Sequence, residues 1–201
     1  MWRYLSISLV VVALDQWVKV SVKKSMYLGE EISLLGDFFS LYFAENNGFA
    51  FGLTLSELSE KLGFMLPAQH GKLILSIFSL LAIGGLFWVL KKFARHKSAL
   101  PYFIALILGG ALGNIIDRLF YGVIFSSINL YEGGLFHGQV VDMFIFNFGP
   151  SGFSSPIFNL ADMAISFGII CILLFQKRFQ KRHERLSMSS RAEGKPSSLP
   201  T

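Results

Sequence analysis

Charged side chains are scarce in this sequence. Asp, Glu, Lys and Arg make up 15% of its 201 residues, whereas about 25% is usual in a soluble domain. Hydrophobic residues make up 53%, and phenylalanine alone occurs 21 times. A chain with this balance is expected to lie mostly in lipid. The net charge of +5 resides in short basic runs beside apolar stretches, so we expect no nucleic acid among its partners.

Cysteine and the common catalytic motifs are also nearly absent. The single cysteine, Cys171, lies in an apolar run, which excludes a disulfide framework or a cysteine-rich metal site within one chain. The four histidines are scattered and no H-E-x-x-H pattern occurs, so a zinc site is not expected. The absence of G-x-S-x-G argues against a serine hydrolase. We therefore predict neither a bound metal nor an organic cofactor.

Four long apolar stretches are the main positive feature of the sequence. They cover residues 4–22, 73–90, 100–120 and 157–175. Each is close to the roughly 20 residues that a helix needs to cross the hydrocarbon core, and lipid requires helices because it cannot satisfy free backbone groups. The predicted fold is an all-α membrane bundle of four transmembrane helices. The N-terminus resembles a signal peptide, but no A-x-A-like site follows, so we expect a retained first helix.

Basic residues near the predicted helices indicate their orientation. They precede the first helix, connect the second to the third, and follow the fourth, so four spans place them all on one side. The positive-inside rule makes that side cytoplasmic. Both termini are then cytoplasmic, and the other two connections are external. The residues are Arg3; Lys91, Lys92, Arg95 and Lys97; and Lys177, Arg178, Lys181, Arg182 and Arg185.

The first external connection, residues 23–72, has a pattern of its own. Between Ile32 and Leu53 it is rich in aromatic and aliphatic residues with partial alternation, which predicts a small β-rich segment on the membrane surface. A short interfacial helix is predicted over 58–66. The alternating residues are Phe39, Leu41 and Phe43.

The rest of the chain divides simply. The second external connection, residues 121–156, is rich in Gly and Phe and is expected to pack against the bilayer or the bundle. We assign residues 1–186 to one integral membrane domain. Residues 187–201 are rich in Ser and Pro and are predicted to be a disordered cytoplasmic tail.

Polar side chains inside apolar spans are costly and usually mark function. Here they recur at spacings of three or four residues, which puts them on one face of the first, third and fourth predicted helices. In the predicted topology all three faces lie near the outer helix ends, beneath the external segment that carries Asp142. The residues are Asp15 and Lys19; Asn114, Asp117 and Arg118; and Asn159 and Asp162.

Each of these groups also has a purely structural explanation. Asp15 and Lys19 could form an interfacial ion pair in which the lysine snorkels toward water. The polar residues of the third helix could clamp helix ends and loop backbone. Asn159 could be an N-terminal helix cap, and Asp142 could be a solvated loop acid. Their convergence at one depth is what favours a common site.

The chemistry that remains for this site is that of two carboxylates. Two close carboxyl groups cannot easily both ionise, so they share a proton. The ionised group can take a proton from water, and the protonated group can donate to a peptide carbonyl or a leaving amine. This hydrolyses an amide without a covalent intermediate. The residues alone leave open which two aspartates form the pair.

Five ordered motifs resemble those of lipoprotein signal peptidases (signal peptidase II), an aspartic intramembrane peptidase family. They extend from Asp15 to Asp162 and so cover nearly the whole predicted bundle. Any one of them is weak, but five in order on the expected helices are specific. The motifs are Asp15-Gln-Trp-Val-Lys19; Asn46-Asn-Gly48-Phe-Ala50-Phe51; Gly109-Gly110-Ala-Leu-Gly113-Asn114-Ile-Ile-Asp117-Arg118; Val140-Val141-Asp142; and Phe158-Asn159-Leu-Ala161-Asp162.

The resemblance implies that Asp142 and Asp162 are the catalytic dyad of an aspartic endopeptidase. It implies a bacterial prolipoprotein substrate, cut just before a cysteine that carries diacylglycerol. The implied location is the bacterial cytoplasmic (inner) membrane, with the site on the extracytoplasmic side and membrane lipid as a partner; we expect a monomer. The residues implied in substrate binding or support of the site are Asp15, Lys19, Asn46, Gly110, Asn114, Asp117, Arg118, Asn159 and Ala161.

Two features depart from the family pattern. Phe49 stands where a small residue is common, which could narrow the site. The stretch between Arg118 and Asp142 is longer than in many relatives, although the residues just before Asp142 restore the motif.

Two other classes of function compete with the peptidase. A small proton-coupled transporter could relay protons through Asp15, Asp117 and Asp162. Transporters commonly show internal repeats and midplane sites, whereas this sequence shows no repeat and its polar residues are off-centre. A non-catalytic membrane scaffold would leave the convergence of carboxylates unexplained.

Overall fold

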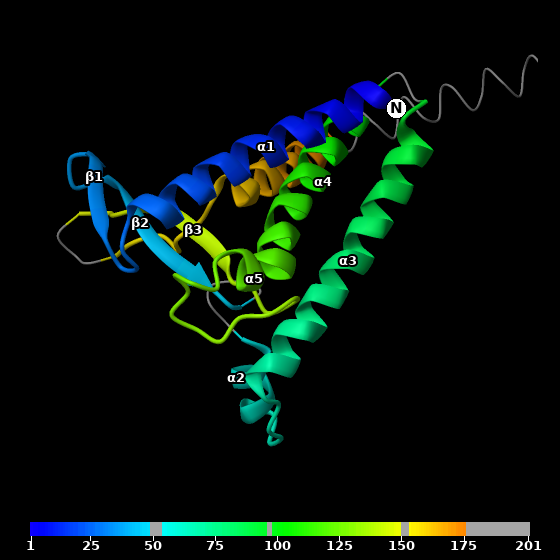
Figure 1. The fold of residues 1–201 in the computed structure, drawn as a ribbon. Coiled ribbons are helices and arrows are strands. Elements are labelled where there is room, and N and C mark those ends of the chain that lie inside the picture. The colour runs from blue at the N-terminus through cyan, green and yellow to red at the C-terminus, as the bar shows by residue number, and fades with distance from the viewer. Residues whose placement is uncertain (49–53, 96–97, 150–152, 176–201) are drawn as a thin grey trace, which may run out of the picture.

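The computed structural model describes residues 1–48, 54–95, 98–149 and 153–175. The expectations for Phe49, for Lys97, for the basic residues 177–185 and for the tail 187–201 lie outside these ranges. In chain order the elements are α1 (Trp2–Ser25), β1 (Glu31–Leu35), β2 (Phe39–Asn46), α2 (Leu55–Lys61), α3 (Ala68–Phe93), α4 (Leu100–Ile116), the π-helical turn η1 (Asp117–Tyr121), α5 (Gly122–Ile124) and β3 (Val140–Phe146), followed by a helix over Leu160–Phe175 (Figure 1).

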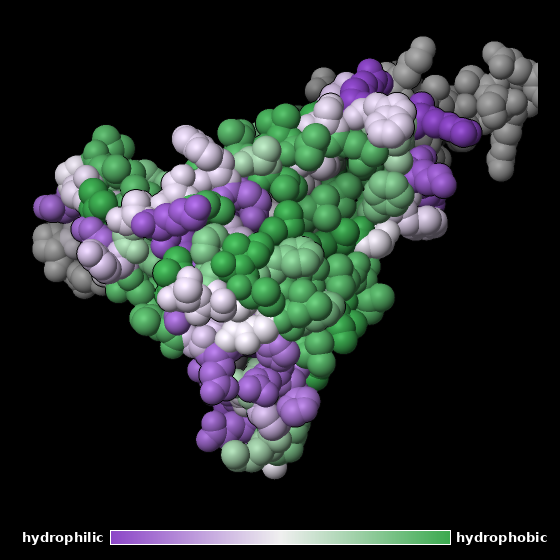
Figure 2. Space-filling model, in the orientation of Figure 1, coloured by the Kyte–Doolittle hydropathy of each residue, from purple (hydrophilic) through white to green (hydrophobic). Residues whose placement is uncertain are grey.

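Three of these helical segments are long and apolar enough to cross a membrane. They are Trp2–Ser25, Ala68–Phe93 and Leu100–Ile124, the last of which combines α4, η1 and α5. Their outer surfaces are apolar: Trp17 on α1 is 69% exposed and Leu81 on α3 is 71% exposed. Figure 2 shows this hydrophobic surface between hydrophilic ends. So much exposed apolar surface indicates a lipid environment, and the prediction of a membrane protein is confirmed.

The last two apolar helices differ from their predicted bounds. The segment that begins at Leu100 continues to Ile124 through the η1 turn. Such π-helical turns are rare and often occur at functional sites. Within the described residues the final helix covers Leu160–Phe175 and is apolar. It begins at Leu160 because the chain before it still pairs with the sheet, where Phe158 forms a bridge to Phe144.

The three strands form one antiparallel sheet in the order β1-β2-β3. β1 and β2 belong to the predicted β-rich segment, but β3 comes from the second external connection, where no strand was predicted. Its first four residues are all buried, so it lacks the alternation that marks a half-exposed strand. Its register pairs Ala44 with Asp142 and Asn46 with Val140. Asp142 therefore lies on a strand and is not a solvated loop acid.

A hydrophobic core fastens this sheet to the helices. It joins the end of α1 to β2, β3 and the η1 turn, and Figure 1 shows these elements together at one end of the molecule. The opposite end, where α1 begins, packs against the end of α3 and the start of α4 through a second cluster that includes Tyr4 and Leu90. The core under the sheet contains Val22, Met26, Phe43, Tyr121, Phe125, Val141 and Met143.

Glycines on α4 let its neighbours approach closely. A Cβ on Gly110 would lie 2.4 Å from the carbonyl oxygen of Ala161, at the start of the final helix. A Cβ on Gly113 would lie 2.5 Å from a carboxylate oxygen of Asp15 on α1. Small residues are how helices in lipid achieve such short backbone separations. The Gly-Gly-x-x-Gly motif therefore sets the spacing of the three helices that carry the polar residues.

Replacing Gly110 with alanine should destabilise the protein, because the new methyl group meets backbone that cannot move aside. We expect a lower thermal unfolding midpoint in detergent, corresponding to about 1–3 kcal/mol of overpacking. Gly84→Ala on α3 is the matched control, since nothing lies within 4 Å of a Cβ there. Equal midpoints for the two variants would contradict the close approach.

Candidate active site

Asp142 and Asp162 lie on different elements but share one partner, Asn159. The side-chain amide of Asn159 donates to Asp142 Oδ1 at 2.6 Å. Its backbone N–H donates to Asp162 Oδ2 at 3.2 Å, and its side-chain carbonyl accepts from the N–H of Asp162 at 2.9 Å. Asn159 is therefore a helix cap, and the same residue holds both carboxylates at one place.

Each of the two carboxylates also receives a second amide donor. Asn46 donates to Asp142 Oδ2 at 3.0 Å, and Asn114 donates to Asp162 Oδ1 at 2.8 Å. The Asn46 amide is itself oriented by the N–H of Gly48, which donates to Asn46 Oδ1 at 2.8 Å. All four carboxylate oxygens thus accept hydrogen bonds from neutral donors on three separate parts of the chain.

The environment of Asp142 favours its protonated form. Asp142 is 3% exposed. The pKa of Asp142 is raised to about 7, first by burial and then by the negative charge of Asp162, against hydrogen bonds from Asn46 and Asn159 that lower it. An aspartic acid in water has a pKa of about 3.9. Asp142 can therefore hold a proton near neutral pH and also release it there.

Lys19 is buried among three acceptors. Its Nζ lies 2.9 Å from Asp15 Oδ2 and 2.9 Å from Asp117 Oδ2, and it donates to Asn114 Oδ1 at 2.8 Å. These contacts use all three N–H groups of the ammonium. The lysine and Asp15 are both 0% exposed. The interpretation of this pair as an interfacial pair with a snorkelling lysine is therefore wrong.

Asp15 and Asp117 each bind Lys19 with one carboxylate and also accept a hydrogen bond from the backbone beside Asp162 or Asp142. Asp15 Oδ1 accepts from the N–H of Ala161 at 2.9 Å, and Asp117 Oδ2 accepts from the N–H of Val141 at 3.2 Å. Ala161 and Val141 each come immediately before one of the paired aspartates. The ionic cluster around Lys19 thus fixes the backbone on which both carboxylates sit.

Two residues that the sequence did not single out, Gln16 and Tyr121, complete this network. Gln16 Nε2 donates to Asp117 Oδ1 at 2.8 Å and to the carbonyl of Gly113 at 3.1 Å. Gln16 Oε1 accepts from the hydroxyl of Tyr121 at 3.0 Å. A signal was present, because an amide in an apolar run beside Asp15 needs buried partners.

Arg118 binds the backbone of two loop segments, one after β2 and one before β3, rather than a carboxylate side chain. Its Nη2 donates to the carbonyl of Gly48 at 2.9 Å, just after β2. Its own carbonyl accepts from the N–H of Gly138 at 3.0 Å, and the next carbonyl, that of Leu119, accepts from Phe136 at 3.1 Å. The long stretch between η1 and β3 therefore starts and ends at the same point.

The structure brings all the predicted site residues to one end of the bundle. In the described ranges, no group of three or more His, Cys, Asp or Glu side chains is arranged to hold a metal ion. What the site offers is one carboxyl that carries a proton near neutral pH and a second carboxyl beside it. The residues are Asp15, Lys19, Asn46, Gly110, Asn114, Asp117, Arg118, Asp142, Asn159, Ala161 and Asp162.

Fold and site together define a class of protein, a membrane-embedded helix bundle that holds two carboxyl groups, those of Asp142 and Asp162, on a shared asparagine. The sequence model of the family described as Signal peptidase (SPase) II matches residues 7–177 of the chain. The chain belongs to the signal peptidase II family and is a peptidase. This confirms the resemblance in the motifs and sets aside the transporter and the scaffold.

Several relatives carry the name lipoprotein signal peptidase. The one from Porphyromonas gingivalis is 35% identical over 195 residues, which cover 84% of this chain and 80% of the relative. The one from Halalkalibacterium halodurans is 30% identical over 182 residues, 90% and 96% of the two chains. The one from Brevibacillus brevis is 37% identical over 174 residues, 87% and 93% of the two chains.

A solved structure has the same fold. It is described as a bacterial membrane enzyme structure obtained by the in meso method at 2.3 Å resolution. The likeness has a TM-score of 0.60 at 24% identity and covers 100% of this chain and 96% of the other.

Removing the ammonium of Lys19 should destabilise the protein strongly, because Asp15 and Asp117 would keep buried charges without a counterion. We expect Lys19→Met to cost about 3–5 kcal/mol of stability, seen as a lower thermal unfolding midpoint in detergent. Lys24→Met is the control, since Lys24 is an exposed lysine on the same helix. A Lys19→Met midpoint no lower than that of Lys24→Met would refute the role of the cluster.

Proposed function

We propose that this chain releases the signal peptides of lipid-modified bacterial prolipoproteins. It hydrolyses the peptide bond before the cysteine that carries diacylglycerol. Membership of the signal peptidase II family supports this substrate, as does the name lipoprotein signal peptidase of the relatives. The observation that carries the mechanism is the pair of hydrogen bonds by which Asn159 holds the carboxylates of Asp142 and Asp162.

The two aspartates divide the work of hydrolysis. Asp162, in its ionised form, takes a proton from a water molecule whose oxygen attacks the scissile carbonyl carbon. Asp142 donates a hydrogen bond to the carbonyl oxygen while the water attacks, and then transfers its proton to the departing nitrogen as the C–N bond breaks and the carbonyl re-forms. The proton gained by Asp162 restores the shared proton of the pair. General acid and base catalysis of this kind contributes about a hundredfold to ten-thousandfold in rate.

The supporting residues act by position. Lys19, Asp15 and Asp117 hold the backbone beside each aspartate, and the amides of Asn46, Asn114 and Asn159 orient the carboxylates. Gly110 and Ala161 allow the final helix to lie close to α4, and Arg118 holds the chain after β2. The contacts described above support each of these roles.

The proposed topology has four spans, with Leu160–Phe175 as the fourth, both termini in the cytoplasm and the site at the extracytoplasmic face of the bacterial inner membrane. It is supported by the basic residues at the end of the bundle opposite the site, since Lys91 and Lys92 lie in the last turn of α3 and Arg3 lies at the start of α1. The positive-inside rule assigns such an end to the cytoplasm. A lipidated substrate would then meet the carboxyl pair at the outer interface. We propose that the chain acts as a monomer.

Neutralising either member of the pair should abolish catalysis without loss of fold. For Asp142→Asn and for Asp162→Asn we expect cleavage of a purified diacylglyceryl-modified prolipoprotein to fall by at least about a hundredfold. Asp37→Asn, an exposed acid in the turn between β1 and β2, should keep full activity. Normal turnover in either site variant would overturn the dyad.

The same assay tests the substrate. The unlipidated form of the prolipoprotein should remain uncut under conditions in which the lipidated form is processed. Equal cleavage of the two forms would refute the lipid requirement but leave the peptidase activity intact.

The proton on Asp142 should limit activity on the alkaline side. Because the pKa of Asp142 is raised to about 7 and the acid form is the active one, kcat/KM should fall as pH rises through about 7. The folded protein binds this proton more tightly than the unfolded chain does, so stability should also fall as pH rises from about 4 to 7. Asp142→Asn should lack this part of the stability change. An alkaline limb above pH 9 would contradict the assignment of Asp142 as the acid.

A further inference from the structure

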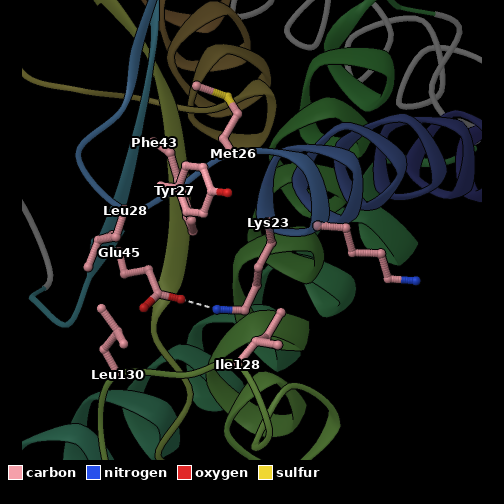
Figure 3. Close-up of a pocket in the computed structure, with 9 residues that line it drawn as sticks. Lys23, Met26, Tyr27, Leu28, Phe43, Glu45, Ile128 and Leu130 are labelled. Atoms are coloured by element: carbon pink, nitrogen blue, oxygen red, sulfur yellow. Dashed lines mark hydrogen bonds and ion pairs between the residues drawn. The ribbon is translucent and has the colours of Figure 1, made fainter.

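Lys23 and Glu45 form a buried ion pair between a helix and the sheet. Of the three ion pairs in the described residues, it alone connects these two layers. The side chains of the pair are 3% and 5% exposed. Figure 3 shows the ammonium of Lys23 directed at the carboxylate of Glu45. Burying two charges carries a desolvation cost that only good geometry offsets. General stability alone therefore does not explain why these two charges are buried together.

The surroundings of the pair make the attraction strong. It lines a cavity of about 260 Å³ whose other walls include Met26, Phe43 and Leu130 (Figure 3). The ammonium of Lys23 also lies 5.9 Å from the ring centre of Phe43 and 5.4 Å from that of Phe125. Because both side chains of the pair are almost fully buried, the local dielectric constant is lower than in water, which strengthens the attraction between opposite charges. The pair therefore fixes the distance between α1 and β2 firmly.

Glu45 lies in the part of β2 that also carries Asn46, the hydrogen-bond donor to Asp142. The distance between α1 and β2 therefore affects the position of Asn46. The ladder between β2 and β3 is interrupted by a register shift between Leu41 and Ala44. Beyond the shift only the last three pairs remain, in which Ala44, Glu45 and Asn46 face β3 residues that include Asp142. This short piece carries Asn46, which donates to Asp142. Neighbouring side chains on a strand point to opposite faces, so Glu45 reaches α1 from behind the site.

We propose that the Lys23–Glu45 pair is a positioning device that holds the end of β2 against α1 and thereby keeps the amide of Asn46 on the carboxylate of Asp142. Arg118 secures the other side of the same segment through the carbonyl of Gly48. Neither Lys23 nor Glu45 touches the reacting atoms. The inference rests on the proposed role of Asp142 as the catalytic acid.

The decisive variant is Glu45→Gln, read through the pH dependence of kcat/KM. The hydrogen bond from Asn46 lowers the pKa of Asp142. If the Lys23–Glu45 pair positions Asn46, loss of the pair weakens this hydrogen bond and raises the pKa of Asp142, so the alkaline limb moves to higher pH. Asn46→Ala removes the same hydrogen bond and should move the limb in the same direction. If Glu45 acted only through its charge, removing a negative charge would lower the pKa and move the limb to lower pH. A shift upward supports the proposal, and a shift downward or none overturns it.

The size and additivity of the effect give a second readout. We expect Glu45→Gln to lower kcat/KM roughly tenfold to a hundredfold, the order expected for a displaced catalytic group. The double variant Glu45→Gln/Asn46→Ala should be no slower than Asn46→Ala alone, because both changes remove the same interaction. Fully multiplicative losses would overturn the proposal.

A neutral double variant covers the case in which Glu45→Gln does not fold because Lys23 is left unpaired. Lys23→Met/Glu45→Met removes both charges and keeps similar side-chain volume, a change that often preserves stability. Its alkaline limb should also move upward, and an unmoved limb overturns the proposal. Lys24→Met and Glu31→Gln, at exposed positions on α1 and β1, should leave the profile unchanged.

Failure of this inference can be told apart from failure of the proposed function. Activity in Asp142→Asn would remove the basis for both. An inactive Asp142→Asn together with an unmoved limb in Glu45→Gln would reject the positioning role alone.

Discussion

The ammonium group of Lys19, held by two carboxylates and one amide, is the interaction on which the site depends. Its three acceptors lead to three different parts of the fold. Asp15 leads to the start of the final helix, Asp117 to the strand β3, and Asn114 to the carboxylate of Asp162. Because lipid offers these groups no other partners, the cluster can be satisfied only if the helices and the sheet meet at one depth.

The cluster around Lys19 is kept one step away from the paired carboxyl groups. Asp142 and Asp162 are held by neutral amides, whereas the charged groups hold the backbone beside them. A direct ammonium contact would favour the ionised form of Asp142 and pull its pKa down. Amide donors orient the carboxylate with a smaller effect on its charge. The arrangement thus combines a fixed position with a pKa near neutrality.

Much of this organisation could be predicted from the sequence, and the remainder fails for physical reasons. The long helices and the polar faces on them are visible because charges stand out in apolar runs. The strand β3 was missed because burial on both faces removes its alternation. The pairing of Lys19 with Asp15 was foreseen, but its full burial was not, because burial depth depends on packing between helices, which spacing along one helix does not reveal.

The contacts made across the fold were the hardest to foresee. Gln16 and Tyr121 meet only after α1 and η1 have packed, and Lys23 contacts Glu45 only once the sheet lies on the helices. The pairing of Asp142 with Asp162 was likewise open from the residues alone and came from the family resemblance. Sequence spacing reports which side chains share an element, but not which elements come together.

The excursion between Leu119 and Gly138 leaves and returns at a single point on η1. Closing a longer loop costs little, about 0.6 kcal/mol for each doubling of its length, and the closing contacts lie upstream of Asp142. Tyr121 and Phe125, at the start of the excursion, belong to the core under the sheet, so changes of length that leave β3 in place are confined to the part after Phe125. The tip of the excursion is therefore a natural place to graft a reporter peptide.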